Sequence, residues 1–147
     1  MKICVQRIKK GKVTLIESGD ITGQIGFGIL ILLGIKTGDN SKNAHFLAEK
    51  AANLRIFEDA EGKMNKSLID VGGEALVVSQ FTLYGNCHKG RRPSFVEAAR
   101  PEIAQPLYLE FVQVLKNEGI RVQTGAFQQE MDVEFINSGP VTLILES

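Results

Sequence analysis

The sequence is poor in cysteine and contains no long apolar run. Among its 147 residues there are two cysteines, Cys4 and Cys87. A chain of this length without a secretory signal gains little from a disulfide, so we expect both to be free thiols. The longest apolar run, residues 28–35, is far shorter than the roughly 20 residues that a membrane-spanning helix needs. The amino terminus also lacks the apolar segment and cleavage site of a secretory signal, and we therefore expect a cytoplasmic protein.

Net charge is absent as well. The 17 basic and 17 acidic side chains cancel, which excludes the strong overall positive field of many nucleic-acid-binding proteins. Any contact with RNA must therefore be local. The short basic segment at residues 89–93 (KGRRP) is either a phosphate-binding loop or an ordinary solvated one.

The patterns of metal sites and of side-chain nucleophiles are missing too. Cys87 and His88 are adjacent, and no C-x-x-C or H-x-x-x-H spacing occurs. No serine lies in a G-x-S-x-G elbow, and no catalytic triad is evident. We therefore expect no metal and no cofactor.

Strand patterns occupy both ends of the chain, and no linker or repeat divides residues 1–147, so a single domain is expected. A hairpin is predicted from strands at residues 2–9 and 12–16 with a turn at Lys10-Gly11. Apolar runs between glycines predict buried strands over residues 29–35 and 75–83, although periodicity alone does not exclude a buried helix at the first. Further strands are expected at residues 121–124, 132–136 and 141–145.

Two helices are predicted between these strands. One is capped by Ser41 and runs to about Leu54. The other covers residues 101–118 and ends at Gly119, with Pro106 in its early turns. Its apolar side is expected to comprise Ile103, Leu107, Tyr108, Phe111, Val112 and Leu115.

Two short motifs have both a structural and a functional interpretation. Residues 79–83 (SQFTL) place hydroxyl and amide groups on a strand predicted to be buried, where each must find a partner or cost roughly 1–3 kcal/mol. They are either hydrogen bonds at a strand end or a binding site. Gly139-Pro140, taken alone, is typical of a turn.

Taken together, residues 79–84 (SQFTLY) and 137–142 (NSGPVT) closely resemble the two signature motifs of D-aminoacyl-tRNA deacylases. The resemblance extends to residues 5–7, 53–59, 90–95 and 125–131, and so runs nearly from end to end. It implies a mixed α/β (α+β) fold, a single compact barrel-like domain of two packed β-sheets with two long helices.

The resemblance implies an ester hydrolase for tRNA proofreading, with D-aminoacyl-tRNA as substrate and no membrane or DNA partner. Family members are homodimers with active sites at the subunit interface, so Gly139 and Pro140 would act on the site of the partner chain. Their peptide bond would be cis, and its carbonyls would form a wall that excludes the side chain of an L-amino acid. Glycyl-tRNA should pass this wall, and the identity of the D side chain should matter little.

The resemblance also implies a role for each site residue. Ser79, Gln80 and Phe81 would hold the terminal adenosine, with Phe81 suited to base stacking. Met131 falls where main-chain atoms lie near the aminoacyl group. Thr82 matches a threonine considered as a nucleophile, but no basic residue neighbours it in sequence. Catalysis assisted by the ribose 2′-hydroxyl is the stronger interpretation. The catalytic candidates are therefore Gln80, Thr82, Gly139 and Pro140.

The sequence leaves two other functions open. An editing domain of the type found in archaeal threonyl-tRNA synthetases would remove an L-amino acid, although the Gly139-Pro140 motif argues against it. A non-catalytic RNA-binding module would need only the basic segment and Phe81. A deacylation assay separates these alternatives.

Overall fold

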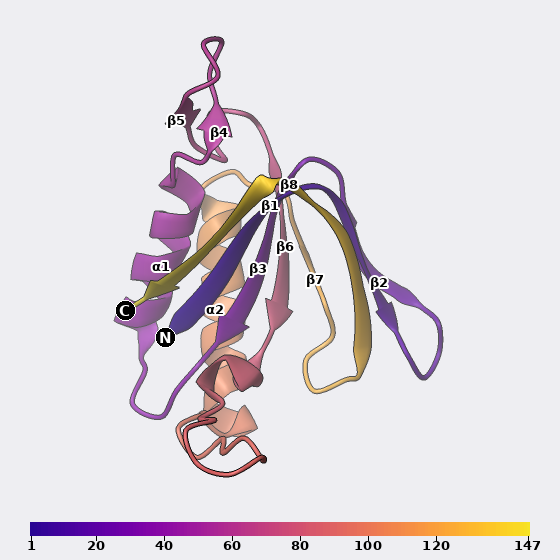
Figure 1. The fold of residues 1–147 in the computed structure, drawn as a ribbon, viewed down its shortest axis with the longest axis vertical. Helices are drawn as coiled ribbons and strands as arrows, with labels where there is room; N and C mark the ends of the chain where they lie inside the picture. Colours follow the sequence, from indigo (N-terminus) through magenta and orange to yellow (C-terminus); the bar gives the residue numbers. More distant parts are fainter.

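The computed structural model describes residues 1–147, which form one large mixed sheet, one small sheet and two long helices (Figure 1). The large sheet comprises β1 (Lys2–Leu15), β2 (Ile21–Ile25), β3 (Gly28–Gly34), β6 (Glu74–Ser79), β7 (Val122–Thr124) and β8 (Met131–Glu146). The small sheet pairs β4 (Phe57–Glu58) with β5 (Met64–Lys66). The helices are α1 (Ser41–Asn53) and α2 (Pro101–Asn117), and a 3-10 turn, η1 (Phe81–Tyr84), follows β6.

The large sheet has the order β2-β1-β3-β6-β7, with β8 paired to β1. Strand β1 is antiparallel to β2, β3 and β8, whereas β3, β6 and β7 run parallel. The first half of β1 pairs with β3 and its second half with β2, so the sheet folds over itself along β1. The far edges then approach: a Cβ on Gly23 of β2 would lie 2.6 Å from the Thr124 carbonyl oxygen of β7. This nearly closed barrel with two long helices confirms the expected fold class.

The main core lies between the large sheet and the two helices, which cover one of its faces (Figure 1). Buried residues of α2 include Leu107, Tyr108, Phe111 and Leu115, as the helical spacing predicts. Ile103, expected on the same side, is instead 51% exposed, and its neighbour Ala104 packs against the core in its place. A second, smaller core fills the inside of the folded sheet and consists of Ile8, Val13, Ile25, Leu30, Leu76 and Val78.

The predicted turn at Lys10-Gly11 is wrong. Strand β1 runs through these residues, and the hairpin to β2 turns at residues 16–20. Gly11 lies where β1 bends, and a Cβ there would be 2.9 Å from Ile8 Cδ1. Its glycine therefore serves close packing at the bend and not a turn.

Three other boundaries differ from the prediction. The cap of α1 is Asn40, whose side chain accepts a hydrogen bond from the Lys42 amide, while Ser41 is the first helical residue. Strand β6 ends at Ser79 instead of residue 83, because the chain turns into η1. The two carboxyl-terminal strands are one, β8, with Gly139 and Pro140 inside it. The end of α2 at Gly119, where φ is 82°, agrees with the prediction.

Both cysteines are free thiols, as predicted, with Cys4 buried and Cys87 exposed. Burial raises the pKa of the Cys4 thiol, so this side chain behaves as a small apolar group. No helix in the structure is long and apolar enough to span a bilayer.

Candidate functional site

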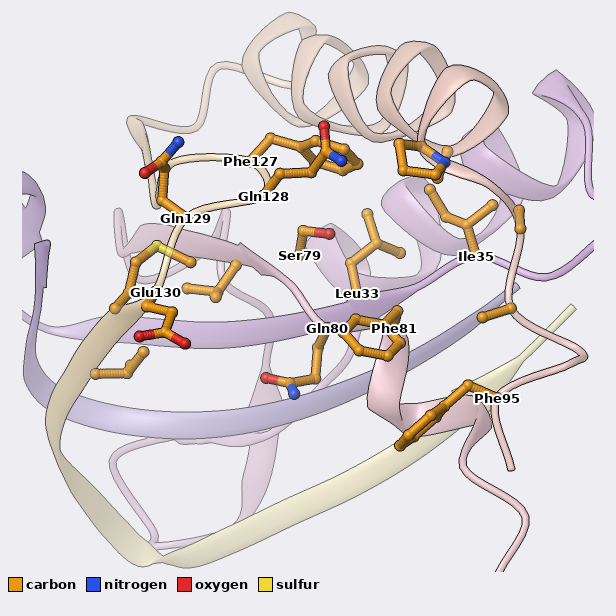
Figure 2. Close-up of a pocket in the computed structure, with 17 residues that line it drawn as sticks. Leu33, Ile35, Ser79, Gln80, Phe81, Phe95, Phe127, Gln128, Gln129 and Glu130 are labelled. Carbon is orange, nitrogen blue, oxygen red and sulfur yellow. The ribbon is translucent and has the colours of Figure 1, made fainter. Parts of the chain in front are cut away.

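A pocket of about 680 Å³ opens where β3 and β6 end, beside the first turns of α2 (Figure 2). Its floor includes Leu33 and Ile35 from the end of β3 and Val78 and Ser79 from the end of β6. Because these two strands are parallel, their carboxyl ends meet at the same edge of the sheet. Sites in sheets with parallel strands commonly lie at such an edge.

The segment after β6 forms one side of the pocket. Ser79 pairs with Leu33, and the Gln80 amide donates to the Leu33 carbonyl oxygen at 2.8 Å before the chain turns into η1. This turn leaves the side chains of Ser79 and Gln80 at the pocket instead of in the core. It also leaves the ring of Phe81 56% exposed. Figure 2 shows this segment beside the pocket.

Phe81 and Phe95 form an aromatic pair on this side of the pocket. Their ring centroids lie 5.0 Å apart with an interplanar angle of 70°, an edge-to-face arrangement. Neither ring is fully buried, since Phe95 is 36% exposed. Two partly exposed aromatic rings beside polar groups provide a surface on which a flat heterocycle can stack.

The opposite side of the pocket is the segment between β7 and β8 (Figure 2). The Sδ atom of Met131 accepts a hydrogen bond from the Ala126 amide at 3.2 Å. A Cβ on Gly125 would lie 2.8 Å from that sulfur, so a side chain there would displace the Met131 side chain. Gln128 adopts a φ of 60°, which is unusual for a residue with a side chain. The side chain of Met131 thus shapes this segment.

An aromatic contact anchors the same segment to α2. Phe127 packs against Tyr108 with ring centroids 5.7 Å apart. The Tyr108 hydroxyl donates to the Val77 carbonyl oxygen at 2.9 Å. Burial raises the pKa of Tyr108 to about 12, so this hydroxyl remains protonated at neutral pH and keeps its role as a donor. This side of the pocket is therefore tied to β6 as well as to the helix.

The pocket offers hydrogen bonds and shape but little charge. Glu130 is the only ionisable side chain among the 17 residues that line it. The predicted candidate Thr82 is not among them, and its hydroxyl accepts a hydrogen bond from the Gln80 side-chain amide. Such an arrangement can bind and orient a ligand, and it brings no pair of acid and base side chains together for proton transfer.

Of the predicted site residues, the structure brings Ser79, Gln80, Phe81 and Met131 to one pocket. Sequence reasoning did not single out Phe95, Phe127 or Glu130. All three lie in segments that carry the family resemblance, residues 90–95 and 125–131, which was the available signal. The first turns of α2 contribute as well, and no pattern in the sequence places them at the pocket.

Gly139 and Pro140 lie elsewhere. They are exposed, their peptide bond is cis, and they interrupt the pairing of β8 with β1 near Arg7. Arg7 of β1 is paired with Ile29 of β3, which in turn is paired with Ala75 of β6. Ala75 lies four residues before Ser79, the residue of β6 that lines the pocket. Four residues span about 13 Å along the strand. Across the sheet, three strand spacings separate β8 from β6. The motif therefore does not reach the pocket of its own chain.

Arg7 fixes the backbone before this motif. The buried guanidinium donates from Nε to the Ser138 carbonyl oxygen at 2.9 Å and from Nη1 to the Ile56 carbonyl oxygen at 2.7 Å. A Cβ on Gly139 would lie 2.7 Å from Arg7 Nη2, so the glycine packs directly against the guanidinium. The bend of β8 is thus tied to β1 and to the segment before β4.

Comparison with known proteins agrees with these motifs. The model of the family described as D-Tyr-tRNA(Tyr) deacylase matches residues 4–146. A protein of a Geobacillus species named D-aminoacyl-tRNA deacylase is 54% identical over 147 residues, which are 100% of this chain and 95% of the relative. A protein of the same name from Alkaliphilus metalliredigens is 55% identical over 147 residues, 100% of this chain and 97% of the relative.

Two solved structures have the same fold. One, described as a c-Myc DNA unwinding element binding protein, superposes with a TM-score of 0.92 at 40% identity and covers 100% of this chain and 99% of its own. The other, described as a probable eukaryotic D-amino acid tRNA deacylase, has a TM-score of 0.88 over 99% of this chain and 98% of its own. Its 16% identity shows the fold alone. By sequence match over nearly its whole length, the chain belongs to the D-Tyr-tRNA(Tyr) deacylase family.

Proposed function

We propose that this protein hydrolyses the ester that links a D-amino acid to the 3′-terminal adenosine of tRNA. The observation that carries the proposal is the convergence of Ser79, Gln80, Phe81 and Met131 on one pocket. Membership of the family and the name shared by full-length relatives at 54–55% identity support the same substrate.

The pocket suits a terminal nucleoside. The exposed ring of Phe81 offers a stacking surface for adenine, and Ser79 and Gln80 offer hydrogen-bonding groups beside it. The volume of about 680 Å³ leaves room for the aminoacyl group toward Met131. The ester would then lie between the segment after β6 and the segment before β8.

The chemistry falls to the substrate in this proposal. The ribose 2′-hydroxyl of the terminal adenosine helps to activate a water molecule, which attacks the ester carbonyl carbon. The bond to the 3′ oxygen breaks, the proton passes to that oxygen, and the D-amino acid leaves. The protein contributes position and hydrogen bonds to the developing oxyanion. Support comes from the pocket lining, in which Glu130 is the only ionisable side chain, and from Thr82, which is outside it.

Chiral selection requires a second copy of the chain. Gly139 and Pro140 do not line the pocket of their own chain, so they would complete the pocket of a partner. Strand β8 supports a homodimer because its only partner is β1 and it exposes large apolar side chains. These side chains are Phe135 (38% exposed), Ile136 (46%), Leu143 (39%) and Ile144 (56%). An exposed apolar edge strand of this length would otherwise be prone to aggregation.

The proposed wall separates substrates by the direction of one side chain. D- and L-aminoacyl esters have the same charge, polarity and volume, so affinity for the side chain cannot distinguish them. Backbone carbonyls held in place, here through Arg7 and the Ser138 carbonyl oxygen, can occupy the space that an L side chain needs. Glycine has no side chain to exclude, so glycyl-tRNA should also be hydrolysed.

The test is hydrolysis of D-tyrosyl-, L-tyrosyl- and glycyl-tRNA by the purified protein. We expect release from the D and glycyl esters while the L ester is spared. Release from the L ester would instead favour a synthetase-type editing domain. Binding of tRNA without release from any ester would leave only an RNA-binding module.

The oligomeric state is tested separately by sedimentation or light scattering. Phe135→Lys together with Leu143→Lys places charges on the exposed side chains of β8. This variant should be monomeric and inactive if the partner completes the site. A monomeric wild-type protein with full chiral selectivity would contradict the shared site.

A further inference from the structure

We propose that the loop at residues 87–93, here called the basic loop, binds the phosphates of the RNA strand that leads into the pocket. This inference rests on the proposed function, since it names how the same site holds its tRNA. Three of the seven loop residues, Lys89, Arg91 and Arg92, are cations. All seven residues are exposed.

The charge around the loop favours phosphate binding. None of its three cations takes part in an ion pair, a property they share with other exposed cations such as Lys42 and Lys50. The loop differs in having three cations within four residues and no carboxylate nearby in the chain. No aspartate or glutamate occurs between Glu74 and Glu97. The protein as a whole has no net charge, so the positive potential of these three cations is local to the loop. Unpaired arginines on an exposed loop are suited to bidentate binding of phosphate.

The loop is attached directly to one side of the pocket. Asn86 and Ser94 close its base by exchanging two backbone hydrogen bonds of 2.8 and 2.9 Å. The next residue, Phe95, lines the pocket and packs edge-to-face against Phe81. A Cβ on Gly85 would lie 3.0 Å from the Phe95 ring, so the chain entering the loop also approaches this ring closely. The basic loop is therefore anchored to the proposed stacking surface.

The pocket itself contains no cation. Its only ionisable side chain is the acidic Glu130. A nucleic acid strand carries one phosphate about every 3.4 Å, so a strand whose last nucleoside enters the pocket brings several negative charges to its mouth. Their neutralisation must come from outside the pocket. The basic loop supplies cations beside the aromatic pair, at the place where those charges would arrive.

The test is the binding of a fluorescent RNA hairpin that consists of an acceptor-stem duplex with a single-stranded 3′ end. The variant is Lys89→Ala with Arg91→Ala and Arg92→Ala. If each lost contact removes about 0.7 from the slope of log K against log salt, three contacts remove about 2. At about 0.1 M salt this corresponds to a rise in Kd between about tenfold and a hundredfold.

Two controls make the result specific. Lys42→Ala with Lys50→Ala and Lys116→Ala removes the same charge from exposed positions on the helices, and it should leave Kd and the salt slope unchanged. A hairpin without the single-stranded 3′ end should be bound weakly and should not respond to the loop variant. Equal losses in the helix variant, equal responses of the two hairpins, or an unchanged salt slope in the loop variant would each overturn the proposal.

A phosphate-free substrate separates this proposal from the proposed function. The D-tyrosyl ester of adenosine should be hydrolysed equally by the wild type and by the loop variant, while D-tyrosyl-tRNA should show a raised KM and an unchanged kcat in the variant. If the wild type cleaves neither ester, the proposed deacylase activity is refuted. The hairpin-binding experiment would still decide whether the basic loop binds RNA phosphates. A loop variant impaired equally on both esters would contradict phosphate binding.

Discussion

Replacing Arg7 with methionine should lower the free energy of unfolding by about 3 kcal/mol. The guanidinium is buried, at 7% exposure, and donates to the carbonyl oxygens of Ser138 and Ile56. A hydrogen bond from a charged donor contributes about 1.5–3 kcal/mol, so two contribute about 3–6 kcal/mol. Methionine retains much of the apolar packing and removes a buried charge, which favours the lower value. The contact with Glu58 at 3.7 Å adds little, because that carboxylate is 58% exposed.

Urea denaturation at one fixed protomer concentration measures this loss, since a dimer would make stability depend on concentration. With m between about 1 and 3 kcal/mol/M, the midpoint should fall by about 1–3 M. Lys9→Met is the matched control, because Lys9 lies on the same strand and is exposed. Equal midpoints for the two variants would refute the stabilising role of Arg7.

The same substitution should weaken chiral selection if the proposed wall depends on Arg7. Without the guanidinium, the Ser138 carbonyl oxygen and Gly139 lose their contact with β1. Hydrolysis of L-tyrosyl-tRNA should then rise relative to that of D-tyrosyl-tRNA. A variant that is less stable but rejects the L ester as strictly as the wild type would show that Arg7 stabilises the bend without positioning the wall.

Three further outcomes follow from individual contacts. Thr82→Ala should keep kcat within about tenfold of wild type, because Thr82 does not line the pocket and the proposed mechanism does not use its hydroxyl. Removal of a true nucleophile costs roughly 10⁶-fold in subtilisin, and a loss of that size with an intact fold would identify Thr82 as the nucleophile. Asp39→Asn should destabilise the protein by about 3–5 kcal/mol in urea denaturation, because Asp39 and the Met1 ammonium form a buried pair at 2.6 Å; an unchanged midpoint would contradict this. Hydrogen bonds from Ser67 to the Asp70 carboxylate hold its pKa below the ordinary 3.8, so the stability they add is present above 3.8 and is lost as pH falls through the lowered pKa. Asp70→Asn should therefore flatten the decline in unfolding free energy measured from about pH 6 to about pH 2.5, and an unaltered decline would contradict it.

The elements predicted correctly are those whose apolar residues follow a regular pattern in the sequence. The apolar run now seen as β3 and the helical spacing of α2 predicted both correctly, because burial on both faces or on one side leaves a direct trace in the sequence. The bend in β1 was misread as a turn because glycine serves both purposes. Only the close approach of Ile8 Cδ1 and Leu76 Cδ2 shows that Gly11 lies in a tightly packed part of the strand.

The candidate site also has a part that the sequence predicted and a part that depends on long-range contacts. Ser79, Gln80 and Phe81 were found through the motif they share with a known family, whereas their apolar neighbours suggested that the strand would continue. The hydrogen bond from the Gln80 amide to Leu33 marks where β6 ends, and this contact joins segments 47 residues apart. Likewise, Pro140 within a continuous strand and Phe127 beside α2 depend on long-range pairing that no local pattern contains.

The termination of β3 and β6 at the pocket separates the residues that hold the fold together from those that touch a ligand. Residues 29–31 and 75–77 lie in the cores, while the pocket is lined mainly by strand ends and the segments next to them, at residues 79–81, 95–104 and 127–131. Substitutions of exposed residues in these segments, such as Gln129 and Glu130, can reshape the pocket at little cost to stability, whereas Phe127, Ala99 and Ala104 pack against the main core. The architecture thus allows the preference for a substrate to diverge among relatives while the fold is retained, which makes the strand ends the natural place to engineer a new specificity.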